Sequence, residues 1–121
     1  RVTLRRAGAG GPVPPMVELA AYRIVQEALT NVVKHSAARH AAVSVVAGAD
    51  GRLTVEVVDE GPRRAAPPGA GRPGFGLLGM RERAAAVGGT LSHGPQPAGG
   101  FRVLASLPTD ERVPVAEVVA G

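Results

Sequence analysis

A long amphipathic helix is the sequence feature that most constrains how this chain can fold. From Met16 to about Ser36, apolar residues recur at intervals of three and four, which predicts one apolar helix face made of Leu19, Ile24, Val25, Ala28, Leu29, Val32 and Val33. Such a helix must bury its apolar face against another element. The remainder of the chain therefore has to supply a surface for it.

The segments that follow this helix predict strands. Runs 42–47 and 53–58 are rich in β-branched residues, and the sequence Gly-Ala-Asp-Gly at 48–51 separates them. This pattern indicates an antiparallel hairpin. Segments 90–93 and 101–107 predict two further strands joined by a turn rich in Gly and Pro.

Two other segments complete the predicted architecture. Residues 1–6 alternate apolar and polar and indicate a short edge strand, and residues 77–87 predict a second helix that Gly88 and Gly89 end. We therefore expect an α+β fold, a two-layer sandwich in which a mixed or antiparallel sheet is covered on one face by helices. Its 121 residues suffice for one domain, at 1–108, followed by a C-terminal tail at 109–121.

Composition excludes several kinds of site. The chain has no cysteine, which rules out a disulfide framework, a thiolate metal site and a cysteine nucleophile. No apolar run approaches the roughly 20 residues that span a bilayer. The net charge is +4, but the arginines are scattered without interleaved aromatic residues, so we expect no nucleic-acid binding and favour phosphate-bearing small ligands.

A polar stripe runs along the otherwise apolar first helix. Arg23, Glu27, Asn31 and His35 follow one another at four-residue spacing, with Lys34 beside the last, so they stack on one face. A solvated face is the simpler interpretation, but asparagine is a poor residue inside a helix unless its amide is used. A carboxamide oxygen suits Mg²⁺, a carboxylate can hold a water or accept a proton, and the cations suit phosphate oxygens. The stripe has the parts of a magnesium–phosphate site.

Asp59 ends the second strand of the predicted hairpin and is followed by Glu60 and Gly61. An acidic residue at this place is often only a turn former. A carboxylate there can also accept a hydrogen bond from the exocyclic amino group of adenine. Guanine would present a carbonyl instead, and two facing acceptors cost about 1–3 kcal/mol.

A second glycine cluster, Gly-Phe-Gly-Leu-Leu-Gly at 74–79, opens directly into the second predicted helix. Glycines allow close approach of the backbone to a ligand, and a helix N-terminus favours anions. The cluster is neither a Rossmann fingerprint nor a P-loop, because no βαβ unit surrounds it and Lys34 follows no glycine loop. A flexible linker is the alternative interpretation. The preceding stretch, 59–73, predicts a mobile loop.

Taken in order, these segments resemble the ATPase domain of bacterial two-component sensor histidine kinases, in the Bergerat-fold (GHKL) superfamily and its subfamily with a short ATP lid. Residues 22–35, YRIVQEALTNVVKH, resemble the N box, and 59–61 the first glycine box. Residues 74–89 resemble the second glycine box, and GGFRVLASLP at 99–108 the last strand. The resemblance extends from residue 1 to about 108, and three boxes in this order are more specific than any one of them.

The resemblance implies roles for individual residues. Glu27 corresponds to the residue that polarises the attacking group and Asn31 to the Mg²⁺ ligand, while Lys34 and His35 correspond to phosphate or ribose contacts. Asp59 corresponds to the adenine-reading carboxylate. The remaining cofactor-binding positions shape the base pocket or line the triphosphate: Gly61, Gly74, Gly76, Leu77 and Gly79. Residues 62–75 become the ATP lid.

The resemblance also implies a reaction and partners. The chain would bind ATP with Mg²⁺ and present the γ-phosphoryl group to a histidine on dimeric helices of the same kinase, which would then serve the receiver domain of a response regulator. None of His35, His40 and His93 has the phosphoacceptor context. We therefore expect a monomeric, cytoplasmic piece that binds ATP and autophosphorylates poorly or not at all. A membrane anchor elsewhere in a full-length protein is compatible with this.

Two departures from the family pattern leave alternatives open. Arg63 stands where the first glycine box usually has a second glycine, and Phe75 stands where a polar residue is common. One alternative is a protein-interaction module with the same fold and impaired nucleotide binding. Another is a stand-alone serine kinase of the anti-sigma type.

Overall fold

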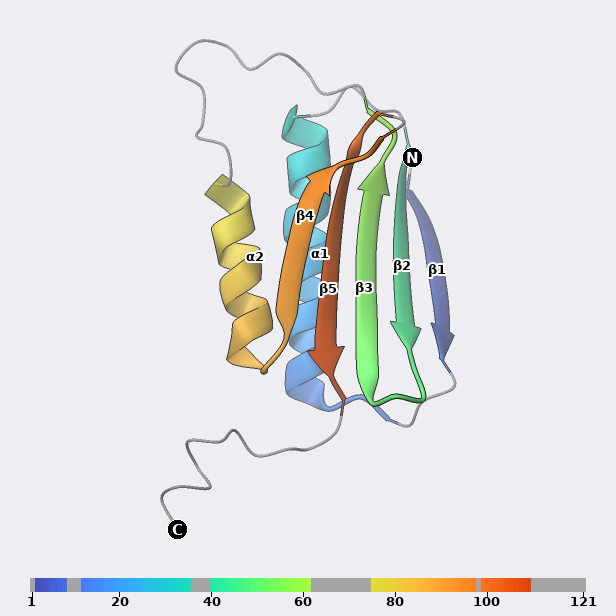
Figure 1. Cartoon of the computed structure of the whole chain (residues 1–121), viewed down its shortest axis with the longest axis vertical. Coiled ribbons are helices and arrows are strands. Elements are labelled where there is room, and N and C mark those ends of the chain that lie inside the picture. The colour runs from blue at the N-terminus through green and yellow to red at the C-terminus, as the bar shows by residue number, and fades with distance from the viewer. Residues whose placement is uncertain (1, 9–11, 36–39, 62–74, 98, 110–121) are drawn as a thin grey trace.

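In the computed structural model, the chain forms a five-stranded sheet in the order β1-β2-β3-β5-β4 with both helices on one face (Figure 1). The structure describes residues 2–8, 12–35, 40–61, 75–97 and 99–109. The elements in chain order are β1 (Val2–Gly8), α1 (Pro15–His35), β2 (Ala41–Ala47), β3 (Arg52–Asp59), α2 (Phe75–Ala86), β4 (Thr90–Pro95) and β5 (Phe101–Pro108). The predicted α+β sandwich is confirmed. The sheet is mixed, because β1 pairs with β2 in parallel whereas the other pairs are antiparallel.

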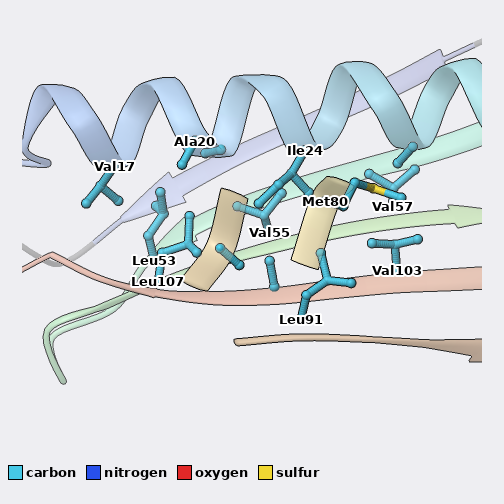
Figure 2. Packing of buried hydrophobic residues seen from close by; sticks show 14 of the residues in the cluster. Val17, Ala20, Ile24, Leu53, Val55, Val57, Met80, Leu91, Val103 and Leu107 are labelled. Atoms are coloured by element: carbon cyan, nitrogen blue, oxygen red, sulfur yellow. The ribbon is translucent and has the colours of Figure 1, made fainter. Parts of the chain in front are cut away.

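The core lies between α1, α2 and the inner face of the sheet. On β3 and β5, buried residues alternate with more exposed ones. The buried apolar residues of these two strands are Leu53, Val55, Val57, Val103, Ala105 and Leu107. Figure 2 shows side chains of these strands pointing toward α1, with Met80 of α2 beside Ile24. Because residues two apart in a strand share a face, this alternation keeps one face of the sheet apolar.

Two residues of the predicted apolar face of α1 are exposed, and three residues outside that face are buried. Val17, Ala20, Ala21, Ile24 and Ala28 are buried, whereas Leu19 and Val33 are 50% and 74% exposed. At 3.6 residues per turn, Leu19 and Val33 lie roughly half a turn away from Ile24. Their place on the predicted apolar face was wrong, since the small alanines take those contacts and allow α1 to approach the sheet closely.

Helix α2 begins at Phe75, two residues earlier than predicted. Gly76 therefore lies in the first turn of the helix and not in a loop, and the predicted lid (62–75) overlaps the helix at Phe75. The first N–H groups of a helix have no intrahelical partners, so glycine is tolerated there. Residues 62–74, with Arg63 and Gly74, lie outside the described residues.

The predicted glycine stop of α2 is confirmed. Gly88 has φ of 79° and donates its N–H to the carbonyl of Ala85 (2.9 Å), and Gly89 donates to the carbonyl of Ala84 (2.8 Å). These two bonds form a Schellman motif, which satisfies the last carbonyls of the helix and turns the chain into β4. Within the described residues, neither helix combines the length and apolar character that a membrane crossing requires.

Candidate functional site

Three elements that carry predicted site residues meet at one end of the molecule. The C-terminal end of α1, the N-terminal end of α2 and the end of β3 lie at the upper end in Figure 1, where β4 also ends and β5 begins. These segments are far apart in the sequence. The fold therefore brings the N box and both glycine boxes toward a common region.

Asn31 is packed against the first turn of α2. A Cβ atom placed on Gly76 would lie 2.9 Å from Nδ2 and 3.0 Å from Oδ1 of Asn31. Such contacts are too close for a real Cβ atom, so the carboxamide occupies the space that the missing side chain leaves. Asn31 also lies two helical turns after Ile24, on the line of α1 that faces the core. This partly buried amide is the polar continuation of the apolar face.

The other stripe residues are arranged as the four-residue spacing predicts, because α1 is continuous from Pro15 to His35. Glu27 is half-buried one turn before Asn31, and Lys34 is exposed in the last turn. His35 is the final residue of α1, and its side chain lies outside the described part. A carboxylate, a carboxamide and an ammonium thus follow each other toward the end of the helix.

Helix α2 directs its N-terminus toward this region. Its first turn has no acidic residue and its last turn carries Arg83, so the positive end of the helix dipole is not neutralised by a neighbouring carboxylate of the same turn. Together with the close approach of Asn31 to Gly76, this arrangement favours an anionic group near the start of α2.

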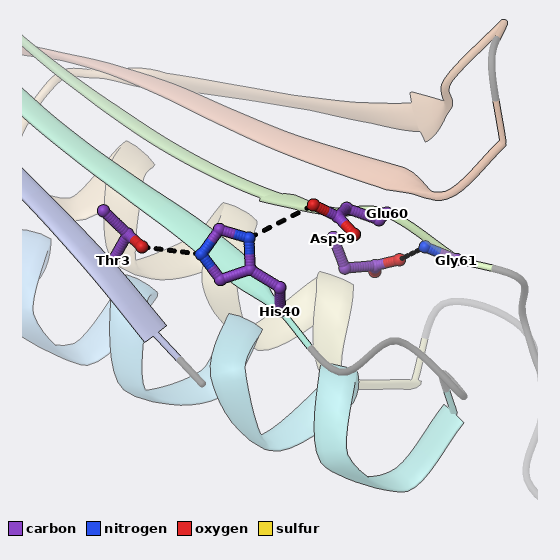
Figure 3. A network of polar contacts seen from close by, with 5 residues as sticks. All are labelled: Thr3, His40, Asp59, Glu60 and Gly61. Carbon is purple, nitrogen blue, oxygen red and sulfur yellow. Dashed lines mark hydrogen bonds and ion pairs between the residues drawn. The ribbon is translucent and has the colours of Figure 1, made fainter.

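Asp59 is the only buried charged residue in the part of the chain that the structure describes, at 2% exposure. Its Oδ1 accepts a hydrogen bond from the N–H of Gly61 at 2.8 Å (Figure 3). Gly61 has φ of 67°, and a Cβ there would lie 2.5 Å from the backbone nitrogen of Gly100. Asp59 therefore does form the turn, as the simpler interpretation expects, but its burial goes beyond what a turn former needs.

A polar network that the sequence did not reveal lies beside this turn. Nδ1–H of His40 donates to Oε1 of Glu60 at 3.1 Å, and Nε2 of His40 is 2.6 Å from Oγ1 of Thr3 (Figure 3). The network connects edge strand β1 to the residue after Asp59. Spacing along the chain could not indicate it, because its three members come from separate segments.

Phe101 is a second residue whose place only the structure reveals. It pairs directly with Asp59 in the β3–β5 register and is half-buried. The sequence by itself predicts Phe101 only as the first residue of a strand. The alternation of apolar residues at 103, 105 and 107 would have placed Phe101 on the inner face, but the strand partner could not be deduced.

Two other predicted contacts have different surroundings. Leu77 is half-buried and packs against the hydrophobic core, and its role in a ligand site stays a prediction. Gly79 is exposed, and a Cβ placed on it would meet nothing within 4 Å. Packing in this structure therefore does not require glycine at position 79, and its role in a ligand site stays a prediction.

The donor set near Asn31 suits a metal ion that arrives with its ligand. Among the described residues, no group of three or more His, Cys, Asp or Glu side chains could hold a metal ion. Mg²⁺ commonly binds through one or two protein oxygens together with substrate phosphates and waters. The Asn31 oxygen beside the start of α2, with Glu27 one turn earlier, fits this mode and does not fit a cage made of protein carboxylates.

Known proteins share this sequence pattern and fold. Residues 16–111 match the family described as histidine kinase-, DNA gyrase B-, and HSP90-like ATPase. The chain is 41% identical over 95 residues to the sensor histidine kinase YxjM of Bacillus subtilis, covering 78% of this chain and 22% of that protein. It is 44% identical over 89 residues to the signal transduction histidine-protein kinase/phosphatase UhpB of Salmonella typhimurium, covering 72% and 16%.

A solved structure supports the same architecture. The crystal structure of the ATP binding domain of PrrB from Mycobacterium tuberculosis superposes with a TM-score of 0.55 at 26% identity, covering 89% of this chain and 82% of that one. By contrast, the aligned region is 22% and 16% of the length of YxjM and UhpB. The chain thus corresponds to one domain of those longer relatives.

Proposed function

This chain belongs to the family of histidine kinase-, DNA gyrase B- and HSP90-like ATPases, as the ATP-binding domain of a sensor histidine kinase. We propose that it binds Mg-ATP and supplies the γ-phosphoryl group for histidine autophosphorylation in two-component signalling. The observation that carries the proposal is the meeting of Asn31, the first turn of α2 and the buried Asp59 at one end of the molecule.

The phosphate end of the nucleotide would lie between α1 and α2. Mg²⁺, when bound, would neutralise charge on the phosphates and so favour phosphoryl transfer. Asn31 would give its carboxamide oxygen to the ion, and Glu27 would orient the attacking group. Lys34 and His35 would contact phosphate or ribose oxygens, and the N–H groups at the start of α2, from Gly76 onward, would bind phosphate oxygens.

The base would be read at the end of β3. Asp59 accepts a hydrogen bond from Gly61 through Oδ1, and an ionised carboxylate has further acceptor sites for an adenine amino group. Because Asp59 is buried, a guanine carbonyl facing it would leave acceptors opposed and poorly solvated, which costs about 1–3 kcal/mol. Because Gly61 has no side chain, the base could approach the backbone of this turn closely.

The proposed partners are those expected of a sensor histidine kinase. The acceptor would be a histidine on the dimerisation helices of the same kinase, and the phosphoryl group would pass to a receiver domain. The similarity of this chain to the histidine kinases YxjM and UhpB supports this proposal. This chain by itself would bind ATP without appreciable autophosphorylation.

Calorimetric titration with Mg-ATP tests the proposal. We expect saturable binding by the wild-type chain, and at least tenfold weaker binding by Asp59→Asn and by Asn31→Ala. Asp50→Asn is the matched control, because Asp50 is an exposed carboxylate in the β2–β3 turn that caps the N–H of Arg52. It should bind ATP as the wild type does.

Three results would contradict the proposal in different ways. No binding at millimolar Mg-ATP would favour the protein-interaction module. Equal losses in Asp59→Asn and Asp50→Asn would place the base elsewhere. If the chain transfers phosphate to a partner and the product is acid-stable phosphoserine instead of acid-labile phosphohistidine, the serine-kinase alternative would be correct.

A further inference from the structure

We propose that Phe101 is a specificity-determining residue for the base, and that His93 and Arg81 are positioning residues that hold its ring beside Asp59. This inference rests on the proposed function and deepens it. None of these three residues was among the predicted site residues, and two of them, His93 on β4 and Arg81 on α2, lie in elements other than the strand pair that presents Asp59.

The first observation is the position of Phe101 relative to Asp59. The two residues are direct partners in the antiparallel β3–β5 pair. Directly opposed residues point to the same face, with Cβ atoms about 4.5–5.5 Å apart. Both therefore face the helical layer, in the same rows as Val57 and Val103. Among Phe, Tyr and Trp rings whose exposure the structure describes, Phe101 is the one that is half-buried, since Tyr22 is 61% exposed.

The second observation is that the backbone before Phe101 is locked onto the Asp59 turn. Gly100 has φ of 94°, and a Cβ on it would overlap the carbonyl oxygen of Asp59. Its own carbonyl accepts a hydrogen bond from Gln96 at 3.0 Å, which closes the β4–β5 turn. The two turns are therefore in close contact, and this contact places the backbone of Phe101 beside the Asp59 turn.

The third observation is a stack that supports the ring from the side away from β3. The imidazole of His93 is stacked on Phe101, with ring centroids 5.8 Å apart and an interplanar angle of 26°. An Nη2–H of Arg81 donates to Nε2 of His93 at 3.3 Å. The stack thus continues from Phe101 on β5 across β4 to α2, the helix whose first turn contacts Asn31.

In this position the Phe101 ring can affect how Asp59 binds the base. An aromatic side chain next to a buried carboxylate excludes water from it, which strengthens a hydrogen bond from an amine and raises the cost of an opposed carbonyl. The ring also offers a flat apolar surface of the kind on which purines pack. Phe101 should therefore increase the preference for adenine over guanine. This preference should depend on the stacked ring of His93 more than on the charge of Arg81.

Competition binding with ATP and GTP on the 121-residue chain tests this. Phe101→Leu should weaken ATP binding by roughly threefold to tenfold and lower the ATP-to-GTP affinity ratio. His93→Ala should shift the ratio in the same direction by a smaller factor, and Arg81→Ala by less still. His93→Phe restores an aromatic stack without the Arg81 bond and should return the ratio close to the wild-type value.

The controls separate a specificity role from general destabilisation. Ser92→Ala changes the neighbour of His93 on the opposite face of β4 and should leave the ratio unchanged. Melting temperatures identify variants that fold poorly, and the ratio of two affinities measured on one variant is unaffected by its folded fraction.

The outcomes distinguish this inference from the proposed function. If Asp59→Asn abolishes ATP binding but Phe101→Leu keeps the wild-type ratio, the role of Phe101 is wrong and the nucleotide site stands. If His93→Ala and His93→Phe both keep the ratio of the wild type while Phe101→Leu lowers it, the positioning role of His93 is wrong. Failure of the wild-type chain to bind ATP would overturn the proposed function and this inference together.

Discussion

Two regions of the same sheet face differ in chemistry although they are equally buried. Away from the Asp59 end of β3 and β5, Val55 and Leu107 are fully buried, and at the upper end of these strands Asp59 is 2% exposed. Burying an apolar side chain stabilises the fold by about 1.5–3 kcal/mol, whereas burying a carboxylate costs free energy unless it is well hydrogen-bonded. Burial alone therefore does not distinguish a core residue from a site residue.

This difference leads to opposite expectations for the two regions. Substitutions of buried apolar residues away from the Asp59 end should lower the free energy of unfolding and leave nucleotide selectivity intact. Substitutions at the Asp59 end should change binding more than they change stability.

Leu107→Ala should have the largest effect. Leu107 is fully buried, and truncation of such a residue costs about 2–5 kcal/mol through lost burial and the cavity left behind. Urea unfolding measures this loss. Leu104→Ala, on the opposite face of the same strand, should cost clearly less. Equal losses at both positions would break the distinction between the two faces.

Gly100→Ala should affect both properties, because Gly100 lies at the boundary of the two regions. A left-handed backbone costs about 1–3 kcal/mol for a non-glycine residue, and the added Cβ would push against the carbonyl oxygen of Asp59. We expect lower stability together with weaker ATP binding in the folded protein. A stability loss with wild-type affinity would show that the two turns are not coupled.

Asp59→Asn should change binding more than stability. The amide keeps an Oδ1 acceptor for the N–H of Gly61, so the loss in the free energy of unfolding should be smaller than in Leu107→Ala. ATP affinity should fall by at least an order of magnitude, corresponding to about 1–3 kcal/mol. Denaturation and titration of the same preparation give both values. A large stability loss would instead assign Asp59 to the core.

Gly76→Ala and Gly79→Ala form a matched pair on α2. In a helix interior, alanine improves helix propensity over glycine by about 1 kcal/mol, and by less in the first turn. At position 79 the Cβ meets nothing, so stability should rise by up to this amount. At position 76 the Cβ would displace the Asn31 carboxamide, so the gain should be cancelled and Mg-ATP affinity should fall. An unchanged affinity in Gly76→Ala would remove Asn31 from the site.

Glu56→Gln should have the smallest effect. Glu56 pairs with Arg102 on the uncovered face of β3 and β5, and both side chains are partly exposed. Exposed ion pairs contribute about 0.2–1 kcal/mol, less at high salt. Unfolding at low and high ionic strength measures this. A loss above this range would mean that the outer face contributes to stability as the inner face does.

The sequence predicted the strands, both helices and the stop at Gly88 because these depend on neighbours in the chain. It also placed Glu27 and Asn31 on one helix face, since that follows from helical spacing. The prediction that Leu19 and Val33 lie on the buried face was wrong, because residues at three- and four-residue intervals can belong to more than one face of a helix. Which face is buried depends on what packs against it.

What the sequence determined by itself is the set of elements and the types of chemical group that each one carries. Three contacts appear only in the folded chain: Phe101 opposite Asp59, His40 between Thr3 and Glu60, and Asn31 in the space over Gly76. The physical reason is range: helical spacing and strand alternation are local, whereas strand register and helix contact depend on segments that meet only when the whole core is assembled.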